Sequence, residues 1–478
     1  MKIHKLVLAA SLFVASSCGK DFVDLNPQDV IPVGGFYKTE SDIKSALTGT
    51  YGYLRGIYNG YWQFFELPSD NTQTFTESES GSGGLDKLTY QPVTTNVSSG
   101  WNSMYHAIAD CNAILDRIGP VTMAEANRSR YIAEAKFIRA LMYFNLVRMY
   151  GGVPLILKQI ETEAEAYTYI RSTEAEVYAQ IEKDLAGAET VLPLRYGTAD
   201  VGRATAGAAK ALLGKVYLQQ KKWVPAESKL AEVIALDVYK ILPTVNAVFG
   251  VGNDNNAEII FSIQYLGGGF GEGNSFAHAF APQTSGSSIV SVVASSTNIG
   301  TQDLYDSFAA GDLRRDAFLG VFQNGKNPNI YYWAKKFVYN INQQNEGSND
   351  WPVIRYADVL LMYAEALNNN NKTTEALTQV NVIRKRAGLP VLAGLSKEAT
   401  QLAIEAERRA ELCFEGHRWP DLIRWGKEVS TMQAFKAKYT AIDPLLANMN
   451  VTADKKLLPI PLREINLNPK LTQNPGYN

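Results

Sequence analysis

The sequence has few of the side chains that metal and redox chemistry need. Its 478 residues include three cysteines and four histidines. His106, His278 and His417 lie far apart and lack metal-binding spacing such as H-E-x-x-H, so they do not predict a zinc site. Cys111 and Cys413 stand in apolar, helix-like stretches, where we expect buried free thiols rather than a disulfide. We expect no bound cofactor.

An excess of charge of either sign is also missing. Lys and Arg number 46 and Asp and Glu number 48, which gives a formal net charge of −2. A domain that binds nucleic acid carries a basic patch that attracts phosphate groups, and this balance provides none. We therefore expect no nucleic-acid partner.

The one long apolar run stands at the start of the chain. Lys2 and Lys5 precede the run LVLAASLFVA at residues 6–15. This run is too short to cross a bilayer core, which takes about 20 residues. Small residues and then Cys18 follow, an order typical of a bacterial lipoprotein signal. We expect residues 1–17 to be removed and Cys18 to be acylated as a membrane anchor. The alternative is a plain secretory signal in which Cys18 is an incidental thiol.

Helical periodicity dominates the remainder. Residues 101–118 and 129–150 repeat apolar side chains every three or four positions, and the second stretch stops at two glycines. Residues 257–265 (AEIIFSIQY) read instead as a strand. The pattern predicts a mainly α protein with a few short strands.

Two stretches, residues 207–238 and 356–388, show the residue spacing of tetratricopeptide repeats, the second more loosely. In such repeats small side chains let two antiparallel helices pack closely. Tyr217 and Trp223 belong to this pattern, so we expect them to pack in the core rather than to contact a ligand. The distance between the two stretches favours separate helix pairs in a scaffold over a continuous solenoid.

Two regions, residues 59–101 and 280–350, read as long irregular loops rich in aromatic and polar side chains. Loops of this length inside a helical protein are usually functional or disordered. The nearby sequence GGGFGEGN does not fit a dinucleotide-binding frame and is not followed by a helix signal, so we expect a flexible loop.

No stretch argues for catalysis. Acidic and basic residues alternate through residues 404–426, where almost every acid has an arginine within one helical turn, so structural ion pairs are favoured over a catalytic carboxylate pair. No G-x-S-x-G turn or Cys/His pairing occurs. Residues 252–258 hold oxygen-bearing side chains at alternate positions but lack the glycine and final glutamate of a calcium loop. We expect a protein that is not an enzyme.

Several blocks of the chain together resemble the SusD/RagB family of surface lipoproteins. The blocks are CGKDFVDLNPQ with FYKTESDIKSALTGTYGYL, then AEAKFIRALMYFNLVRMYGGVPLI, RYADVLLMYAEALNNN with ALTQVNVIRKRAGLP, ERRAELCFEGHRWPDLIRWG and LLPIPLREINLNPKLTQNPGY. They occur in order and run through most of the chain after Cys18.

The resemblance implies a SusD-like fold: tetratricopeptide-like helix pairs that form a scaffold with long irregular loops. It implies one globular body over residues 18–478, with an N-terminal part at 21–220 and a C-terminal part at 257–478. It also implies a SusC-like, TonB-dependent outer-membrane barrel as partner, which the lipoprotein covers as a hinged lid. Asp21 resembles the family's surface-export signal, so the expected location is the cell surface, lipid-anchored in the outer membrane.

The resemblance further implies an oligosaccharide or polysaccharide ligand. Its contacts are expected in the early loop, residues 59–101, and in the irregular middle region, which lies between the two repeat units. Aromatic rings cover the C–H face of a sugar, and polar side chains bind its hydroxyl groups. The candidate contacts in those regions are Trp62, Asp70, Asn71, Trp101, Tyr265, Phe270, Tyr332 and Trp333. Trp101 opens a helix and Trp333 lies in a strand-like stretch, so either ring is as well suited to the core. Trp351 and Trp419 are assigned to the scaffold.

Three other functions stay open from the sequence. A peptide-binding lid would share the architecture but would use backbone hydrogen bonds and groove contacts more than aromatic platforms. A surface glycosidase would release product from an oligosaccharide. A helical scaffold without a small ligand would bind the barrel alone.

Overall fold

The computed structural model describes residues 35–75, 81–325 and 329–477. Within them the chain is mainly helical, as the sequence predicts, and the strands are few and short. The helices are α2 (Glu40–Asn59), α3 (Trp62–Phe65), α4 (Ser82–Asp86), α5 (Thr95–Arg117), α6 (Glu125–Tyr150), α7 (Glu163–Ala166), α8 (Glu174–Glu189), α9 (Ala206–Gln219), α10 (Trp223–Ala235), α11 (Phe276–Ala279), α12 (Gln302–Ser307), α13 (Leu313–Phe318), α14 (Tyr356–Asn369), α15 (Thr373–Arg386), α16 (Lys397–Leu412), α17 (Arg418–Trp425), α18 (Glu428–Tyr439) and α19 (Leu462–Leu467). The strands are β1 (Thr72–Gln73), β2 (Ile259–Ile263), β3 (Ile299–Gly300), β4 (Leu319–Gln323), β5 (Ile330–Ala334) and β6 (Trp351–Arg355), and short 3-10 turns include η4 (Val245–Ala247) and η6 (Pro444–Asn448).

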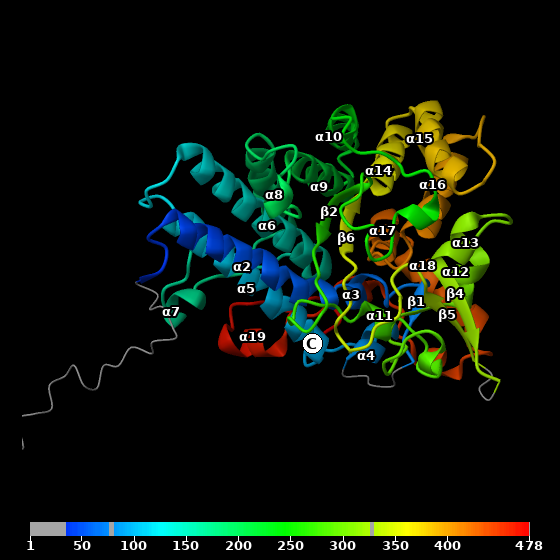
Figure 1. The fold of residues 1–478 in the computed structure, drawn as a ribbon. Coiled ribbons are helices and arrows are strands. Elements are labelled where there is room, and N and C mark those ends of the chain that lie inside the picture. The colour runs from blue at the N-terminus through cyan, green and yellow to red at the C-terminus, as the bar shows by residue number, and fades with distance from the viewer. Residues whose placement is uncertain (1–34, 76–80, 326–328, 478) are drawn as a thin grey trace, which may run out of the picture.

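The long helices pack in a series. Helix α6 lies against α5 and α8, α8 against α9, α9 against α10, and α10 against α14, which packs on α15 and α16. Figure 1 shows α2, α5, α6 and α8 on one side of the molecule and α14, α15 and α16 on the other, with β2 and β6 between them. Strands β4 and β5 lie beyond, beside α12 and α13.

Local sequence signals set where these helices begin and end. The Thr39 hydroxyl accepts a hydrogen bond from the backbone N–H of Asp42, whose carboxylate binds the Thr39 backbone in return, so a capping box starts α2. Thr173 and Glu176 start α8 in the same way. Helix α6 ends at Gly151, whose positive φ of 72° suits a residue without a side chain. The predicted helices at residues 101–118 and 129–150 are thus confirmed as α5 and α6.

The two predicted repeat units are helix pairs, α9 with α10 and α14 with α15. Gly214 of α9 explains how closely the first pair packs. A Cβ atom at this position would lie 2.7 Å from the Leu230 Cδ2 atom of α10, well inside van der Waals contact. The small residue that the repeat pattern requires is therefore a packing requirement here.

Two small antiparallel sheets join distant parts of the chain. Strands β1, β3, β5 and β4 form a four-stranded sheet in that order, in which Thr72 pairs with Gly300 and Gly300 pairs with Tyr332. The early loop and the irregular middle region therefore lie side by side. Strand β2, which the sequence predicts, pairs with β6 in a second sheet.

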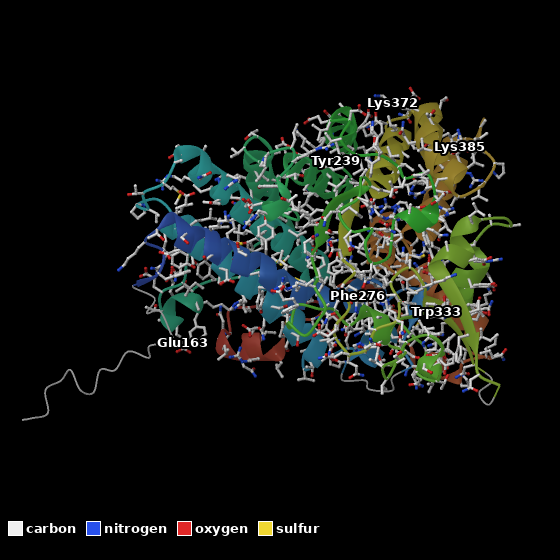
Figure 2. The ribbon with its side chains drawn as sticks, in the orientation of Figure 1. Glu163, Tyr239, Phe276, Trp333, Lys372 and Lys385 are labelled. Carbon is white, nitrogen blue, oxygen red and sulfur yellow. The ribbon has the colours of Figure 1, made fainter. Side chains whose placement is uncertain are left out.

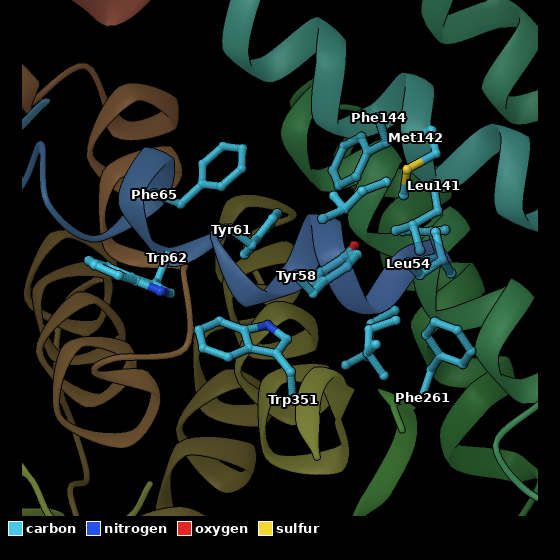
Figure 3. Close-up of a cluster of buried hydrophobic side chains, with 14 of the residues drawn as sticks. Leu54, Tyr58, Tyr61, Trp62, Phe65, Leu141, Met142, Phe144, Phe261 and Trp351 are labelled. Carbon is cyan, nitrogen blue, oxygen red and sulfur yellow. The ribbon is translucent and has the colours of Figure 1, made fainter. Parts of the chain in front are cut away.

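One buried apolar cluster extends from Ile43 to Tyr477. Figure 3 shows part of it, where Tyr58, Tyr61 and Trp62 lie near Trp351. A second cluster fills the space between α14, α15 and α16. Cys111 and Cys413 are free and buried, as predicted. Burial raises the pKa of Cys413 to about 12, so this thiol is not ionised at neutral pH.

A buried ionic network ties the C-terminal helices to the strands. The Arg355 guanidinium of β6 lies 2.9 Å from a carboxylate oxygen of Glu258, 2.6 Å from Glu411 and 2.7 Å from Glu415. Arg386 also binds Glu258 and Glu411. The predicted structural ion pairs in residues 404–426 are thus confirmed. Arg408 of α16 binds Asp421 of α17 at 2.7 Å, so the pairs do join two helices, and several other partners come from far along the chain.

Candidate functional site

A groove of about 600 Å³ opens beside the four-stranded sheet. It gathers side chains from three distant stretches: the early loop, the irregular middle region and the segment around the end of α18. We call it the sheet groove, and its lining residues are Gln73, Thr74, Phe75, Lys87, Gln283, Thr301, Gln302, Asn329, Ile330, Tyr332, Phe435, Tyr439, Ile442, Asp443, Pro444, Leu445 and Leu446.

Tyr332 of β5 forms part of one wall and is held firmly. Its hydroxyl donates a hydrogen bond to the side-chain oxygen of Gln302, and its ring stacks on Tyr305 with centroids 4.6 Å apart. The Arg315 guanidinium lies 5.2 Å from the centroid of the Tyr305 ring. This stack fixes the Tyr332 ring before any ligand arrives, which lowers the entropy lost on binding.

Phe75 stands at the end of β1 and is half-buried. Its backbone N–H donates to the Ser296 carbonyl at 3.0 Å, and its ring lies 4.7 Å from that of Tyr331. The neighbouring Thr74 N–H donates to the Asp86 carboxyl at 3.2 Å. Burial raises the pKa of Asp86 to about 8, so this group is mostly protonated at neutral pH and adds little charge behind the groove.

The C-terminal wall comes from α18 and η6. The Tyr439 hydroxyl lies 3.2 Å from the Asp303 carboxylate, which also binds Lys438 and Arg409 at 3.0 and 2.9 Å. Burial alone would raise the pKa of Asp303, but Arg409 and Lys438 outweigh it and lower that pKa. The Asp303 carboxylate therefore stays ionised. It binds Lys438 and Arg409, and this fixed carboxylate in turn positions the Tyr439 hydroxyl.

Asp70 and Asn71, two of the predicted contacts, support the groove from beneath and are buried. The Thr301 hydroxyl donates to the Asp70 carbonyl at 2.6 Å, and the Thr301 N–H donates to the Asn71 carbonyl at 2.9 Å. The Asp70 carboxylate binds Arg418 and Arg409, and Arg409 also donates to the Asn71 side chain. These two arginines lower the pKa of Asp70 against the opposing effect of burial. Both predicted residues thus hold β1 and β3 in place rather than line the groove.

Three predicted aromatic contacts lie in the core. Trp62 is 2% exposed, its ring meets Phe280 edge-on, and its indole N–H donates to the Asn59 carbonyl. Trp101 packs against Tyr150 and lies inside α5, which begins at Thr95 and not at Trp101. Tyr265 is 7% exposed. The sequence could not separate these rings from ligand-facing ones, because Trp62 lies in a short helix within a loop-like region, Trp101 on the inner face of α5 and Tyr265 just after β2.

The last two predicted contacts lie outside the groove lining. Phe270 is 71% exposed on the glycine-rich loop. Trp333 of β5 lies on the sheet side of the molecule in Figure 2, and its ring packs over Gly320, where a Cβ atom would lie 2.0 Å from it. Of the predicted contacts, Tyr332 is the one that lines the groove.

No motif in the sequence marks the other lining residues. Phe75, Gln73 and Gln283 lie in the predicted regions, but nothing distinguishes them from their neighbours until β1 pairs with β3. The segment around Tyr439 and residues 442–446 carries no binding signal of its own.

The described part of the chain also bears on metal-binding and membrane-spanning sites. No group of three or more His, Cys, Asp or Glu side chains there could hold a metal ion. In residues 252–258, which lack the full pattern of a calcium loop, Glu258 binds Arg355 and Arg386. None of the described helices has the length and apolar character to cross a membrane. Cys18 and the predicted signal lie outside the described residues.

Comparison with known proteins gives consistent matches. A model of the SusD family matches residues 319–477, and a model described as starch-binding and associating with the outer membrane matches residues 21–218. A SusD-like protein of Formosa agariphila is 29% identical over 535 residues, which cover 100% of this chain and 99% of the relative. The starch-binding protein SusD of Bacteroides thetaiotaomicron is 23% identical over 499 residues, covering 88% and 86% respectively.

The fold matches as well. A solved structure of a laminarin-binding SusD-like protein aligns with a TM-score of 0.80 at 29% identity, covering 92% of this chain and 100% of that one. Two family models in the two halves of the chain, relatives aligned along most of its length and a shared fold lead to one conclusion: the chain belongs to the SusD/RagB family.

Proposed function

We propose that this protein binds a neutral oligosaccharide or polysaccharide in the sheet groove and delivers it, without cleaving it, to a TonB-dependent outer-membrane transporter. The observation that carries the proposal is the lining of the groove. Aromatic rings from Phe75 and Tyr332 stand among the side-chain amides of Gln73, Gln283, Gln302 and Asn329.

This chemistry suits sugars. Ring faces pack on C–H groups, and amides offer both donors and acceptors to hydroxyl groups. Among the described lining residues Lys87 and Asp443 are the charged ones, and their charges are opposite. A strongly charged ligand would therefore gain little electrostatic affinity from this lining. The names of the laminarin-binding and starch-binding relatives agree with a glycan. Peptide import, the alternative, finds no support among the relatives named above.

We further propose that residues 18–478 act as one body, anchored to the outer membrane by lipid on Cys18 and seated on a SusC-like barrel. The family model described as associating with the outer membrane supports this location. Phe270 and Trp333 stay proposed contacts for a ligand that extends past the groove.

The direct test is affinity electrophoresis of the chain from residue 19 onward, which keeps every described residue. The gels contain laminarin, starch or another polysaccharide, and a parallel titration uses a peptide mixture. We expect retardation by a neutral glycan and loss of about tenfold in affinity for Phe75→Ala and for Gln302→Ala, a typical effect of losing one good contact.

Tyr53→Ala is the matched control, because Tyr53 is a partly exposed aromatic residue of α2 that lies outside the groove lining. Equal loss in the control and the groove variants would place the binding site elsewhere. A folded protein that binds peptides and no glycan would overturn the proposal.

A further inference from the structure

A second concave site lies among the helix pairs, away from the sheet. Its volume is about 480 Å³, and it shares no lining residue with the sheet groove. It forms where α10 and α16 begin and where α14 and α17 end. We call it the tryptophan pocket, lined by Lys221, Trp223, Glu365, Asn368, Asn369, Lys397, Glu398, Gln401, Leu402, Glu405, Arg424, Trp425 and Lys427.

Trp425, the last residue of α17, is held in one orientation. Its indole Nε1 donates to the Glu365 carboxylate at 3.0 Å. Arg424 binds the two oxygens of the same carboxylate at 3.0 and 2.8 Å, and its guanidinium lies 5.3 Å from the centroid of the Trp425 ring. A half-buried indole that is fixed in this way is a preorganised platform.

Trp223, the first residue of α10, comes from a repeat unit far away in the sequence. The repeat pattern assigns it to the core, and its ring does pack against buried residues. It is only half-buried, however, and lines the pocket. Within the described residues no hydrogen-bond acceptor takes its indole N–H, which leaves this donor available.

The remaining lining is polar and balanced in charge. Four basic side chains face three carboxylates, and Lys427 pairs with Glu405 at 2.6 Å. This balance excludes the strong single-sign field that recognition of phosphate or an acidic polymer needs.

Two of the lining amides are already bound: Asn368 is buried and bonds Lys397 and Thr373, and Asn369 donates to the Glu365 carbonyl at 2.9 Å. The half-buried Gln401 amide makes only long contacts, of 3.4 and 3.5 Å, and can still bond a ligand.

We propose that the tryptophan pocket is a second carbohydrate site, which binds one or two sugar units of the same neutral glycan as the sheet groove. A concave site with a fixed aromatic platform, a free indole donor and a neutral amide matches the two surfaces of a sugar ring. The inference rests on the proposed glycan-binding function. Two sites on one chain bind a long polymer more tightly than a short fragment, because the second contact is intramolecular.

The test compares short and long ligands on the chain from residue 19 onward. Isothermal titration with short oligosaccharides from the polysaccharide retained on the gels gives the number of sites, and electrophoresis in the intact polysaccharide gives the avidity. We expect two equivalents of short ligand for the parent protein and one for Trp223→Ala. We also expect Trp223→Ala to reduce affinity for the polymer at least tenfold.

Gln401→Ala, which changes a half-buried lining amide, is the milder second variant and should weaken the same site. Tyr363→Ala is the matched control, since Tyr363 is a half-buried aromatic residue of α14 outside the lining. Circular dichroism verifies that each variant is folded.

The outcomes separate the two proposals. One equivalent of sugar, lost with Phe75→Ala and unchanged by Trp223→Ala, overturns the second site and keeps the groove. Binding that survives every groove variant but is lost with Trp223→Ala overturns the groove and keeps the pocket. Normal sugar binding combined with reduced co-purification of the barrel protein in Trp223→Ala would make the pocket a protein contact instead. A complete absence of glycan binding overturns both proposals.

Discussion

The Arg418 guanidinium donates two parallel hydrogen bonds to the Asp70 carboxylate, from Nε to Oδ1 at 2.8 Å and from Nη2 to Oδ2 at 2.9 Å. The pair joins the early loop to α17, across almost 350 residues of sequence, and both side chains are largely buried. Because Thr301 binds the backbone of residues 70 and 71, this ion pair also fixes β3 beside β1. The sheet groove therefore depends on an interaction that no ligand needs to touch.

The first prediction concerns this pair. Asp70→Asn leaves Arg418 without its buried counter-charge and removes one of the two carboxylates that Arg409 binds, so we expect the free energy of unfolding to fall by about 3–5 kcal/mol. Urea denaturation measures it. Asp316→Asn, which breaks the exposed pair of Arg315 and Asp316, should change stability by about 0–1 kcal/mol. An Asp70→Asn protein of unchanged stability that no longer bound glycan would show that Asp70 contacts the ligand directly.

The second prediction is a pH dependence that comes from Asp86. Its folded-state pKa of about 8 lies above the ordinary value of 3.8, so the folded state holds this proton more tightly than the unfolded state. The resulting stabilisation is complete below pH 4 and is lost as the pH rises through 8. Asp86→Asn removes this titration.

We therefore expect the stability of Asp86→Asn relative to the parent protein to increase by about 1.4 kcal/mol per pH unit between pH 5 and pH 7. Urea denaturation at several pH values gives the difference, and the comparison cancels the titration of groups common to both proteins. Parallel stability profiles for the two proteins would contradict the prediction.

The third prediction contrasts two helical glycines. An alanine at Gly214 meets Leu230 of α10, so we expect a net loss of about 1–2 kcal/mol, the effect of overpacking minus the gain in helix propensity. At Gly49 of α2 a Cβ atom has nothing within 4 Å, so Gly49→Ala should stabilise by about 0.5–1 kcal/mol. Thermal denaturation measures both. A stabilising Gly214→Ala would mean that α9 and α10 separate easily.

The sequence predicted those parts of the fold that depend on local periodicity. The helix at residues 129–150, the strand around Ile260 and the repeat pairs are all present because their signals lie within a few turns. The structure of the loop-like regions was harder to predict. Short helices such as α3 place Trp62 in the core, and a single-sequence pattern of this length does not distinguish such a helix from a loop.

The site was predicted by region and less well by residue. The early loop and the middle region do meet, but β1 and β3 are two residues each and carry no recognisable strand signal. Without that pairing Phe75 has no reason to stand out from its neighbours. The contribution of α18 and residues 442–446 depends on the tertiary fold alone. The ion pairs show the same limit: Glu411 was expected to bind an arginine nearby, yet its partners include Arg355 of β6 and Arg386 of α15.

The network around Arg355 has a consequence for how the molecule opens. If α16 detached together with the turn that follows it, Arg355 would stay buried without Glu411 and Glu415, its two closest counter-charges. Partial opening of the C-terminal helices is therefore costly, and these helices should exchange their amide hydrogens only when the strands they clamp also unfold. At the proposed cell-surface location, that coupling would deny proteases the locally unfolded segments they cut.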